Sequence, residues 1–427
     1  MVRINLIYEF MNTLFIIIVS VILIEFIADK ILDFLNLKNL SPELPKGAEG
    51  IYDAEKYKKS QEYYKVNHNF LTLTGSISLI TILLMLFLNG FAFADSFVMQ
   101  YTQNSIVMAL LFFGILGFAS DLLGTPFSIY KIFVIEKKFD FNKTTIKTFI
   151  ADKLKGYFLA LIIGGGLLSL IVWIYDSTGE YFWLFAWVVI SLFSTFMTMF
   201  YTSLIVPLFN KLTPLPEGEL RTAIEMYCKK VGFKLNNLFV IDGSKRSAKA
   251  NAYFSGLGAK KTIVLFDTLI EKHTTEELVA VLAHEVGHCK KKHTLMVTMQ
   301  EILQMGVMLF IMSFFLGNPM LSEALGIIRD TKSCVSTFHV DILVFGILYS
   351  PLSEILGIIS NIISRKCEFQ ADAYAKKTYS GDALQSALKK LSVNNLSNLK
   401  PHPAYVFVHY SHPPLLERLK ALKKITD

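Results

Sequence analysis

The sequence predicts a mainly helical, polytopic membrane protein with a small β-sheet on one side of the membrane. Of its 427 residues, 53% are hydrophobic, more than the roughly 45–50% typical of soluble proteins. Long apolar stretches recur along the chain, and each is long enough to cross about 30 Å of hydrocarbon as a helix. Lysine and arginine collect in alternate connecting segments, as expected for a protein that crosses the membrane repeatedly.

Seven transmembrane helices are expected. Five windows contain no charged residue over about 17 residues or more: 70–94, 104–120, 156–175, 181–210 and 302–322. Two further stretches, 4–27 and 342–364, are apolar but contain the charged residues Glu9, Glu25 and Glu354. The first of these, 4–27, could instead be a cleaved signal peptide. No A-x-A-like site follows it, so a retained helix is favoured.

The basic residues set the expected orientation. Most of the 42 lysines and arginines lie in 28–69, 125–155, 211–293 and 365–427. By the positive-inside rule these segments face the cytoplasm, which places the N-terminus outside or in a lumen and the C-terminus inside. A bacterial inner membrane and an ER membrane both suit this orientation. The net charge of +7 then reflects topology, and no aromatic-interleaved basic stripe indicates nucleic-acid binding.

Four regions follow from these spans. They are a membrane region 1–210 with spans one to five and cytoplasmic loops 28–69 and 125–155, a segment 211–293, spans six and seven in 294–364, and a cytoplasmic C-terminal segment 365–427.

A small sheet is expected within segment 211–293. The stretches 238–242, 251–256 and 262–267 are rich in β-branched and aromatic residues, and GLGAKK between the last two predicts a hairpin. Thr274 and Glu277 then fit a capping box that starts a helix, which we expect to continue into the sixth span.

That helix carries the motif 284-HEVGH-288. His284 and His288 are four residues apart, so both rings project from one helix face and can bind one metal ion. Glu285 lies beside them and can deprotonate a metal-bound water. The simpler alternative is a helix terminus at which the histidines meet carbonyl groups and lysines.

A catalytic zinc needs a third protein ligand and an open position. The candidate ligand is Glu368 in 364-SRKCEFQADAYA-375, a second helix expected over 362–380. Asp372 follows one turn later, where it can accept a hydrogen bond from a ligand histidine and fix its tautomer. Two predicted spans separate His288 from Glu368, so both return to the cytoplasmic face. An ordinary solvated helix after a membrane span is the alternative.

Other residues have weaker claims to a role. Asn251, Ala252 and Tyr253 fit an edge strand that pairs with an extended peptide, although an ordinary core strand fits equally well. His412 and Arg418 suit an oxyanion or a substrate carboxylate, the alternative being solvated charges on a tail helix.

His293 follows the motif closely and lies next to three lysines. We expect it to be a residue of the membrane interface rather than a metal ligand.

Together these motifs resemble the type I CAAX prenyl endopeptidase family of integral-membrane zinc metalloproteases. The resemblance rests on 284-HEVGH-288, 364-SRKCEFQAD-372, 251-NAYFSG-256 with 263-IVLFDTL-269, and 409-HYSHPPLLERL-419. It implies a barrel of seven helices around a large water-filled chamber, capped on the cytoplasmic side by the metallopeptidase domain.

The resemblance also implies residue roles. One zinc ion would be bound by His284, His288 and Glu368, with Glu285 as general base. Asn251 and its strand would contact substrate, and His412 and Arg418 would belong to the active site.

The expected function is therefore zinc-dependent hydrolysis of peptide bonds in membrane-associated or C-terminally prenylated (CAAX) proteins. The alternative is a broad-specificity quality-control protease for membrane proteins that requires no prenyl group. A transporter or scaffold is a third reading, but it leaves the predicted ligand geometry a coincidence.

Overall fold

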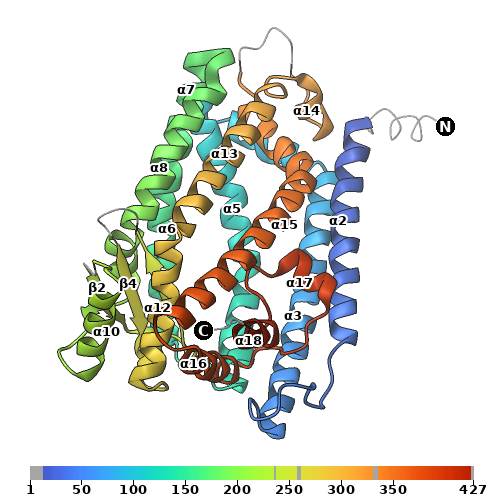
Figure 1. The fold of residues 1–427 in the computed structure, drawn as a ribbon. Helices are drawn as coiled ribbons and strands as arrows, with labels where there is room; N and C mark the ends of the chain where they lie inside the picture. The colour runs from blue at the N-terminus through green and yellow to red at the C-terminus, as the bar shows by residue number, and fades with distance from the viewer. Residues whose placement is uncertain (1–12, 235–236, 257–260, 330–334, 425–427) are drawn as a thin grey trace.

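The computed structural model describes residues 13–234, 237–256, 261–329 and 335–424. Within these residues, long helices lie side by side in a bundle, and a small sheet with several short helices covers one end of it (Figure 1). The mainly helical fold class is confirmed.

The long helices of the bundle are α2 (Thr13–Lys38), α3 (Ala54–Phe87), α5 (Ser105–Tyr130), α6 (Ile146–Leu159), α7 (Gly165–Thr178), α8 (Phe182–Leu204), α13 (His293–Ser313) and α15 (Phe338–Thr378). Two shorter helices, α4 (Gly90–Met99) and α14 (Pro319–Ala324), belong to the end opposite the sheet. The remaining helices are α9 (Val206–Phe209), α10 (Glu219–Lys230), α11 (Asp267–Ile270), α12 (Thr275–Lys290), α16 (Gly381–Asn394), α17 (Pro403–His409) and α18 (Leu415–Lys424).

Five helical stretches in the described residues are long and apolar enough to cross a membrane: 54–87, 105–136, 146–209, 293–313 and 338–378. The stretch 146–209 reverses at a short 3-10 turn, Gly179–Tyr181, where Gly179 takes a φ of 51°. Helices α7 and α8 are therefore two separate segments that pack against each other. Part of the predicted first span, 4–12, lies outside the described residues, and α2 extends its remainder to Lys38.

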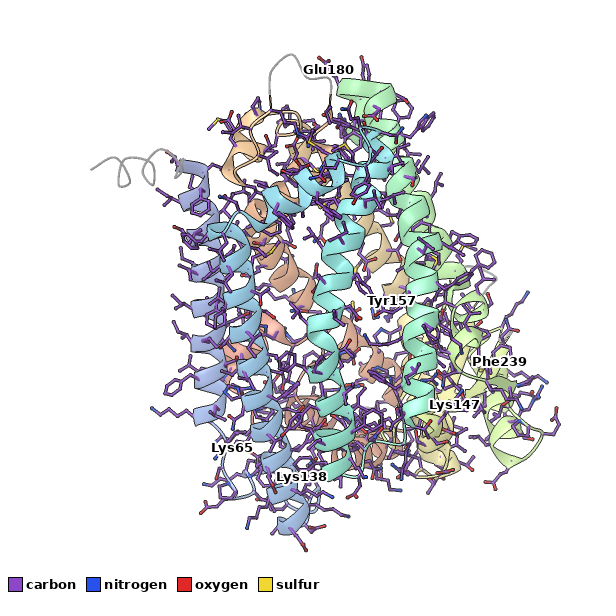
Figure 2. The ribbon with its side chains drawn as sticks, turned by 180° about the vertical axis from the view of Figure 1, so that it is seen from behind. Lys65, Lys138, Lys147, Tyr157, Glu180 and Phe239 are labelled. Carbon is purple, nitrogen blue, oxygen red and sulfur yellow. The ribbon has the colours of Figure 1, made fainter. Side chains whose placement is uncertain are left out.

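Helices of the bundle expose many large hydrophobic side chains, among them Phe34, Phe118, Leu192 and Leu303. Apolar surface of this extent is costly in water but suits a lipid surrounding. In contrast, Lys65, Lys138 and Lys147 lie at the end of the bundle that carries the sheet, and Glu180 lies at the opposite end (Figure 2).

The longest helix, α15, joins the bundle to the site. We expected a span over 342–364 and a second helix over 362–380; the structure shows one continuous helix of 41 residues despite Pro351. Its first turn is anchored at the far end of the bundle, where buried Asp95 accepts hydrogen bonds from His339 Nε2 (2.8 Å) and Arg329 Nη2 (2.7 Å). Helix α15 therefore runs from that end of the bundle to the end that carries the sheet.

The expectation that the motif helix continues into the sixth span is wrong. Helix α12 ends at Lys290, and α13 begins at His293. Between them Lys292 takes the left-handed conformation, with a φ of 61°. A residue in this conformation cannot continue a right-handed helix, so the chain changes direction directly after the motif.

The small sheet has four strands in the order β1 (Leu212–Pro214), β2 (Asn237–Ile241), β4 (Thr262–Phe266) and β3 (Ala252–Ser255). Strands β2 and β4 are parallel, and the other two pairs are antiparallel. Three strands match the prediction, and the β3–β4 pairing confirms the hairpin, whose connection 257–260 lies outside the described residues. Strand β1 was missed because three residues ending in proline give no periodic signal. Strand β3 forms one edge of the sheet, as expected.

Candidate active site

Helix α12 starts at the predicted capping box. The Thr274 hydroxyl accepts a hydrogen bond from the Glu277 amide, and the Glu277 carboxylate accepts one from the Thr274 amide. The same carboxylate accepts hydrogen bonds from Ser386 Oγ (2.6 Å) and Lys390 Nζ (2.8 Å) on α16. The start of the motif helix is therefore fixed by its own cap and by a neighbouring helix.

Small residues let α12 and α15 approach closely. Ala371 is fully buried in this contact. Opposite it lies Gly287, where an added Cβ would stand 3.1 Å from the Ala371 Cα and 3.2 Å from the Tyr374 Cβ. Glycine within the motif therefore favours this close packing, a role that the spacing of the motif does not predict.

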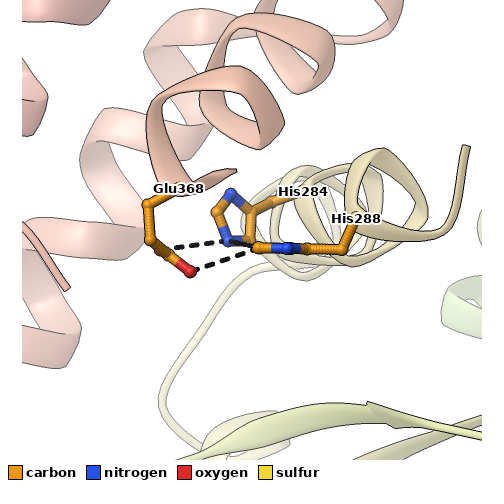
Figure 3. A group of neighbouring side chains, drawn as sticks. All are labelled: His284, His288 and Glu368. Carbon is orange, nitrogen blue, oxygen red and sulfur yellow. Dashed lines mark hydrogen bonds and ion pairs between the residues drawn. The ribbon is translucent and has the colours of Figure 1, made fainter. Parts of the chain in front are cut away.

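This approach brings the three predicted ligands together (Figure 3). The Nε2 atoms of His284 and His288 lie 3.1 Å apart. Glu368 places Oε1 3.2 Å from His288 Nε2 and Oε2 3.5 Å from His284 Nε2. Residues of α12 and α15 that are distant in sequence thus bring two ring nitrogens and one carboxylate group together.

The donor set fits zinc. Tetrahedral zinc with bonds of about 2.0–2.1 Å holds its ligand atoms about 3.3 Å apart. The two Nε2 atoms are 3.1 Å apart, and the Glu368 oxygen nearest to each lies at 3.2 and 3.5 Å, so the separations lie around this value. Glu368 Oε2 is also buried, and its neighbours are His284 Nε2 at 3.5 Å and Arg418 Nη1 at 3.3 Å, neither in good hydrogen-bond geometry. A buried carboxylate oxygen with such loose contacts can accept a cation.

His284 is oriented by Asp372, as predicted. Its Nδ1 lies 2.9 Å from Asp372 Oδ1, which leaves Nε2 for the metal. Burial lowers the pKa of His284, but hydrogen bonds to Asp372 and Glu368 raise it to about 9. In the absence of metal this imidazole therefore holds a proton that metal binding must displace.

Arg418 pairs with Asp372, a contact that was not expected. Its Nε and Nη2 donate to the two oxygens of Asp372 at 2.8 and 2.6 Å, and Nη1 lies 3.3 Å from Glu368 Oε2. The guanidinium also borders the cavity at the site. Its position beside the ligands is clear, and its contact with substrate stays a prediction.

A cavity of about 380 Å³ opens beside the ligand atoms. Glu285 lines it, and burial raises the pKa of this carboxyl above its usual range. Asn251, Ala252 and Tyr253 of the β3 edge line the same cavity. An acid–base group and a free strand edge therefore share one space with the three ligands.

His412 also reaches this cavity. Its Nε2 lies 3.4 Å from Glu368 Oε1, and its side chain is 66% exposed.

His293 does not lie free at an interface, contrary to the expectation. It is 4% exposed, and its Nδ1 lies 3.1 Å from Nδ1 of the ligand His288. Its Nε2 lies 2.9 Å from Gln370 Oε1. This contact has no signature in the sequence, because it depends on the break between α12 and α13 at Lys292.

Two histidines and a carboxylate at zinc-like separations, with a second carboxylate lining the adjacent cavity, define a metallopeptidase site. The apolar helices make this a metallopeptidase of the membrane-embedded class.

Comparison with known proteins supports the same class of protein. Residues 33–211 match the family described as CAAX prenyl protease N-terminal, five membrane helices, and residues 214–426 match peptidase family M48. The chain is 36% identical over 417 residues to CAAX prenyl protease 1 homolog of Arabidopsis thaliana, covering 95% of this chain and 96% of that one. It is 35% identical to CAAX prenyl protease 1 of Saccharomyces cerevisiae, covering 94% of each.

Among solved structures, the crystal structure of S. mikatae Ste24p is similar, with a TM-score of 0.91 and 34% identity over 96% of this chain and 99% of that chain. The chain therefore belongs to peptidase family M48 and is a multi-pass membrane zinc metalloprotease of the CAAX prenyl protease 1 type.

Proposed function

We propose that this protein hydrolyses peptide bonds near the C-terminus of prenylated CAAX proteins. The observation that carries the proposal is the shared cavity, in which three ligand atoms, the Glu285 carboxyl and the β3 edge face one another. The names of the similar proteins, CAAX prenyl proteases, supply the substrate class.

Strand β3 offers a peptide the backbone edge that faces away from β4, where the Ala252 amide donates to its neighbour's side-chain oxygen, Asn251 Oδ1 (2.9 Å). The Phe266 amide of β4 donates to the Asn251 carbonyl directly before β3, so Asn251 and Phe266 are a hydrogen-bonded pair of this ladder. In an antiparallel ladder such pairs alternate, and the backbone groups of Ala252 and Phe254 consequently point away from β4. An extended substrate would add as a further strand by bonding to them.

One zinc ion per chain would be held by His284, His288 and Glu368. When bound, zinc supplies a Lewis acid that polarises a carbonyl group and makes water acidic. Glu285 then accepts a proton from the attacking water and delivers it to the leaving amine. His412 donates a hydrogen bond to the developing oxyanion, and Asp372 and Arg418 hold the ligands in place, with Arg418 also bordering the substrate.

The surrounding architecture would be a barrel of seven helices around a large water-filled chamber. Within the described residues, the five apolar stretches provide six membrane-crossing segments, because 146–209 folds back on itself, and α2 adds a seventh. The lysines at the sheet end support a cytoplasmic active site and C-terminus, with the N-terminus outside or in the lumen. The division near residue 210 into a membrane region and a metallopeptidase region is part of the same proposal.

The test uses detergent-purified protein and one C-terminal peptide with and without a farnesyl group, followed by mass spectrometry. We expect cleavage of the farnesylated form alone, and loss of cleavage with retained zinc in Glu285→Gln. Equal cleavage of both forms would instead support a broad-specificity quality-control protease. Unchanged cleavage by Glu285→Gln would overturn the proposed base.

A further inference from the structure

The second ring nitrogen of each ligand histidine has a partner. His284 uses Nε2 at the ligand cluster and places Nδ1 against Asp372. His288 also uses Nε2 at the cluster, and its Nδ1 lies 3.1 Å from Nδ1 of His293. The two ligands are therefore supported in different ways, one by a carboxylate and the other by a third imidazole.

The chain break after the motif creates this contact. In a continuous α-helix, the residue five positions after His288 would be rotated from it by about 140°. The left-handed conformation of Lys292 ends α12 and starts α13 in a new direction. As a result the rings of His288 and His293 meet edge to face, with centroids 5.1 Å apart.

Metal binding fixes the positions of the protons. A histidine that binds a metal through Nε2 has no proton there and keeps one on Nδ1. The Nδ1–H of His288 must then donate to Nδ1 of His293, which accepts with its lone pair. His293 carries its own proton on Nε2 and donates it to Gln370 Oε1, 2.9 Å away.

Burial makes this arrangement specific. His293 is 4% exposed, so water is a poor substitute for its acceptor nitrogen. Gln370 is exposed, so water can partly replace its oxygen. Loss of the His293 acceptor should therefore have the larger effect.

We propose that His293, itself oriented by Gln370, is a positioning residue that holds His288 in the tautomer and ring orientation able to bind zinc. The proposal rests on the proposed zinc ligands and adds a residue that does not touch the metal. His293 does for His288 what Asp372 does for His284. Partners of this kind typically change metal affinity by about 10- to 100-fold.

The test compares two substitutions of nearly equal shape, His293→Asn and His293→Leu, in the full-length detergent-purified protein. Asparagine places its side-chain oxygen where Nδ1 of histidine stood, so it can accept the His288 proton, whereas leucine cannot. The zinc dissociation constant is measured by competition with a chelator, without reference to cleavage.

We expect His293→Leu to raise the zinc dissociation constant by about 10- to 100-fold and His293→Asn to restore most of the loss. A purely structural role predicts the opposite order, because leucine fills a buried site better than a polar amide. Equal constants for the two variants, or a constant for His293→Leu equal to that of the unmodified protein, would overturn the proposal.

A second pair guards against variants that fail to fold. Gln370→Glu keeps an acceptor for the His293 proton, and Gln370→Met removes it at similar length. We expect weaker zinc binding in Gln370→Met than in Gln370→Glu. Equal binding would show that Gln370 does not orient His293. Because zinc binding is read directly, a protein that binds zinc but cleaves no prenylated peptide would refute the proposed function and leave this inference standing.

Discussion

Arg418 and Asp372 form a doubly hydrogen-bonded ion pair directly behind the metal ligand His284. Nε and Nη2 of the arginine lie 2.8 and 2.6 Å from the two carboxylate oxygens. The arginine side chain is 11% exposed and the aspartate 1%, so solvent screens this pair little. A buried aspartate held by arginine remains ionised and can orient the imidazole in front of it. The pair thereby links the tail helix α18 to both helices that carry the ligands.

Arg418→Lys should weaken zinc binding by about 10- to 100-fold, because a lysine keeps the charge but cannot make both hydrogen bonds. The measurement is a chelator competition on the purified variant. Arg246 provides the matched control, since it forms the same two-bonded pair with Asp152 away from the site. Arg246→Lys should leave zinc affinity unchanged. Equal zinc affinity in Arg418→Lys and the unmodified protein would show that the pair does not support the metal.

Gly287→Ala should lower both thermal stability and zinc affinity. The new Cβ would lie 3.1 Å from the Ala371 Cα, so α12 and α15 must separate and carry the ligands apart. Overpacking of this kind costs about 1–3 kcal/mol, against which the better helix propensity of alanine returns about 1 kcal/mol.

The control for this change is Gly346→Ala on α15, where nothing lies within 4 Å of the added Cβ. Thermal unfolding and zinc titration of both variants check the prediction. If Gly287→Ala behaves like Gly346→Ala, the close approach of the two helices is not what positions the ligands.

Zinc affinity should rise with pH between about 6 and 9, by up to about tenfold per pH unit. In the metal-free protein the pKa of His284 is raised to about 9, and zinc must displace its proton. The sign for stability is opposite. The protonated imidazole stabilises the metal-free fold fully below its ordinary pKa of about 6.5, and this contribution is lost as pH rises through 9.

Chelator competition and thermal unfolding of the metal-free protein, each across this pH range, check both signs. Asp372→Asn removes the main partner that raises the pKa of His284, so the zinc affinity of this variant should depend less on pH. An affinity that does not change with pH in the unmodified protein would contradict the assignment of a proton to His284.

The parts of the molecule that were predicted from sequence are those with local signals. Apolar length indicates membrane helices, and a spacing of four residues places His284 and His288 on one helix face. The capping box at Thr274 is equally local. These features arise from the order of residues within one element, and the structure confirms each.

The parts that were missed depend on backbone geometry or tertiary contact. The left-handed Lys292 has no sequence signature, and without it His293 would face away from His288. The commitment of Arg418 to Asp372 requires α18 to dock on α15, which no spacing within the tail predicts. Strand β1 owes its conformation to β2 rather than to its own three residues.

The β3 edge gives the last prediction. Ala252→Pro should reduce cleavage of the peptide substrate while leaving the fold and zinc affinity intact. The Ala252 amide points away from β4 by the alternation of the ladder and donates to Asn251 Oδ1 (2.9 Å), a bond that a substrate carbonyl would replace, so proline there removes this donor but none used by the sheet. Tyr253→Pro is the contrast, since the Tyr253 amide belongs to the β3–β4 ladder, and that variant should lose stability. Peptidase kinetics, zinc titration and thermal unfolding of both variants separate the two effects. Full activity in a folded Ala252→Pro protein would mean that substrate does not bind this edge as a strand.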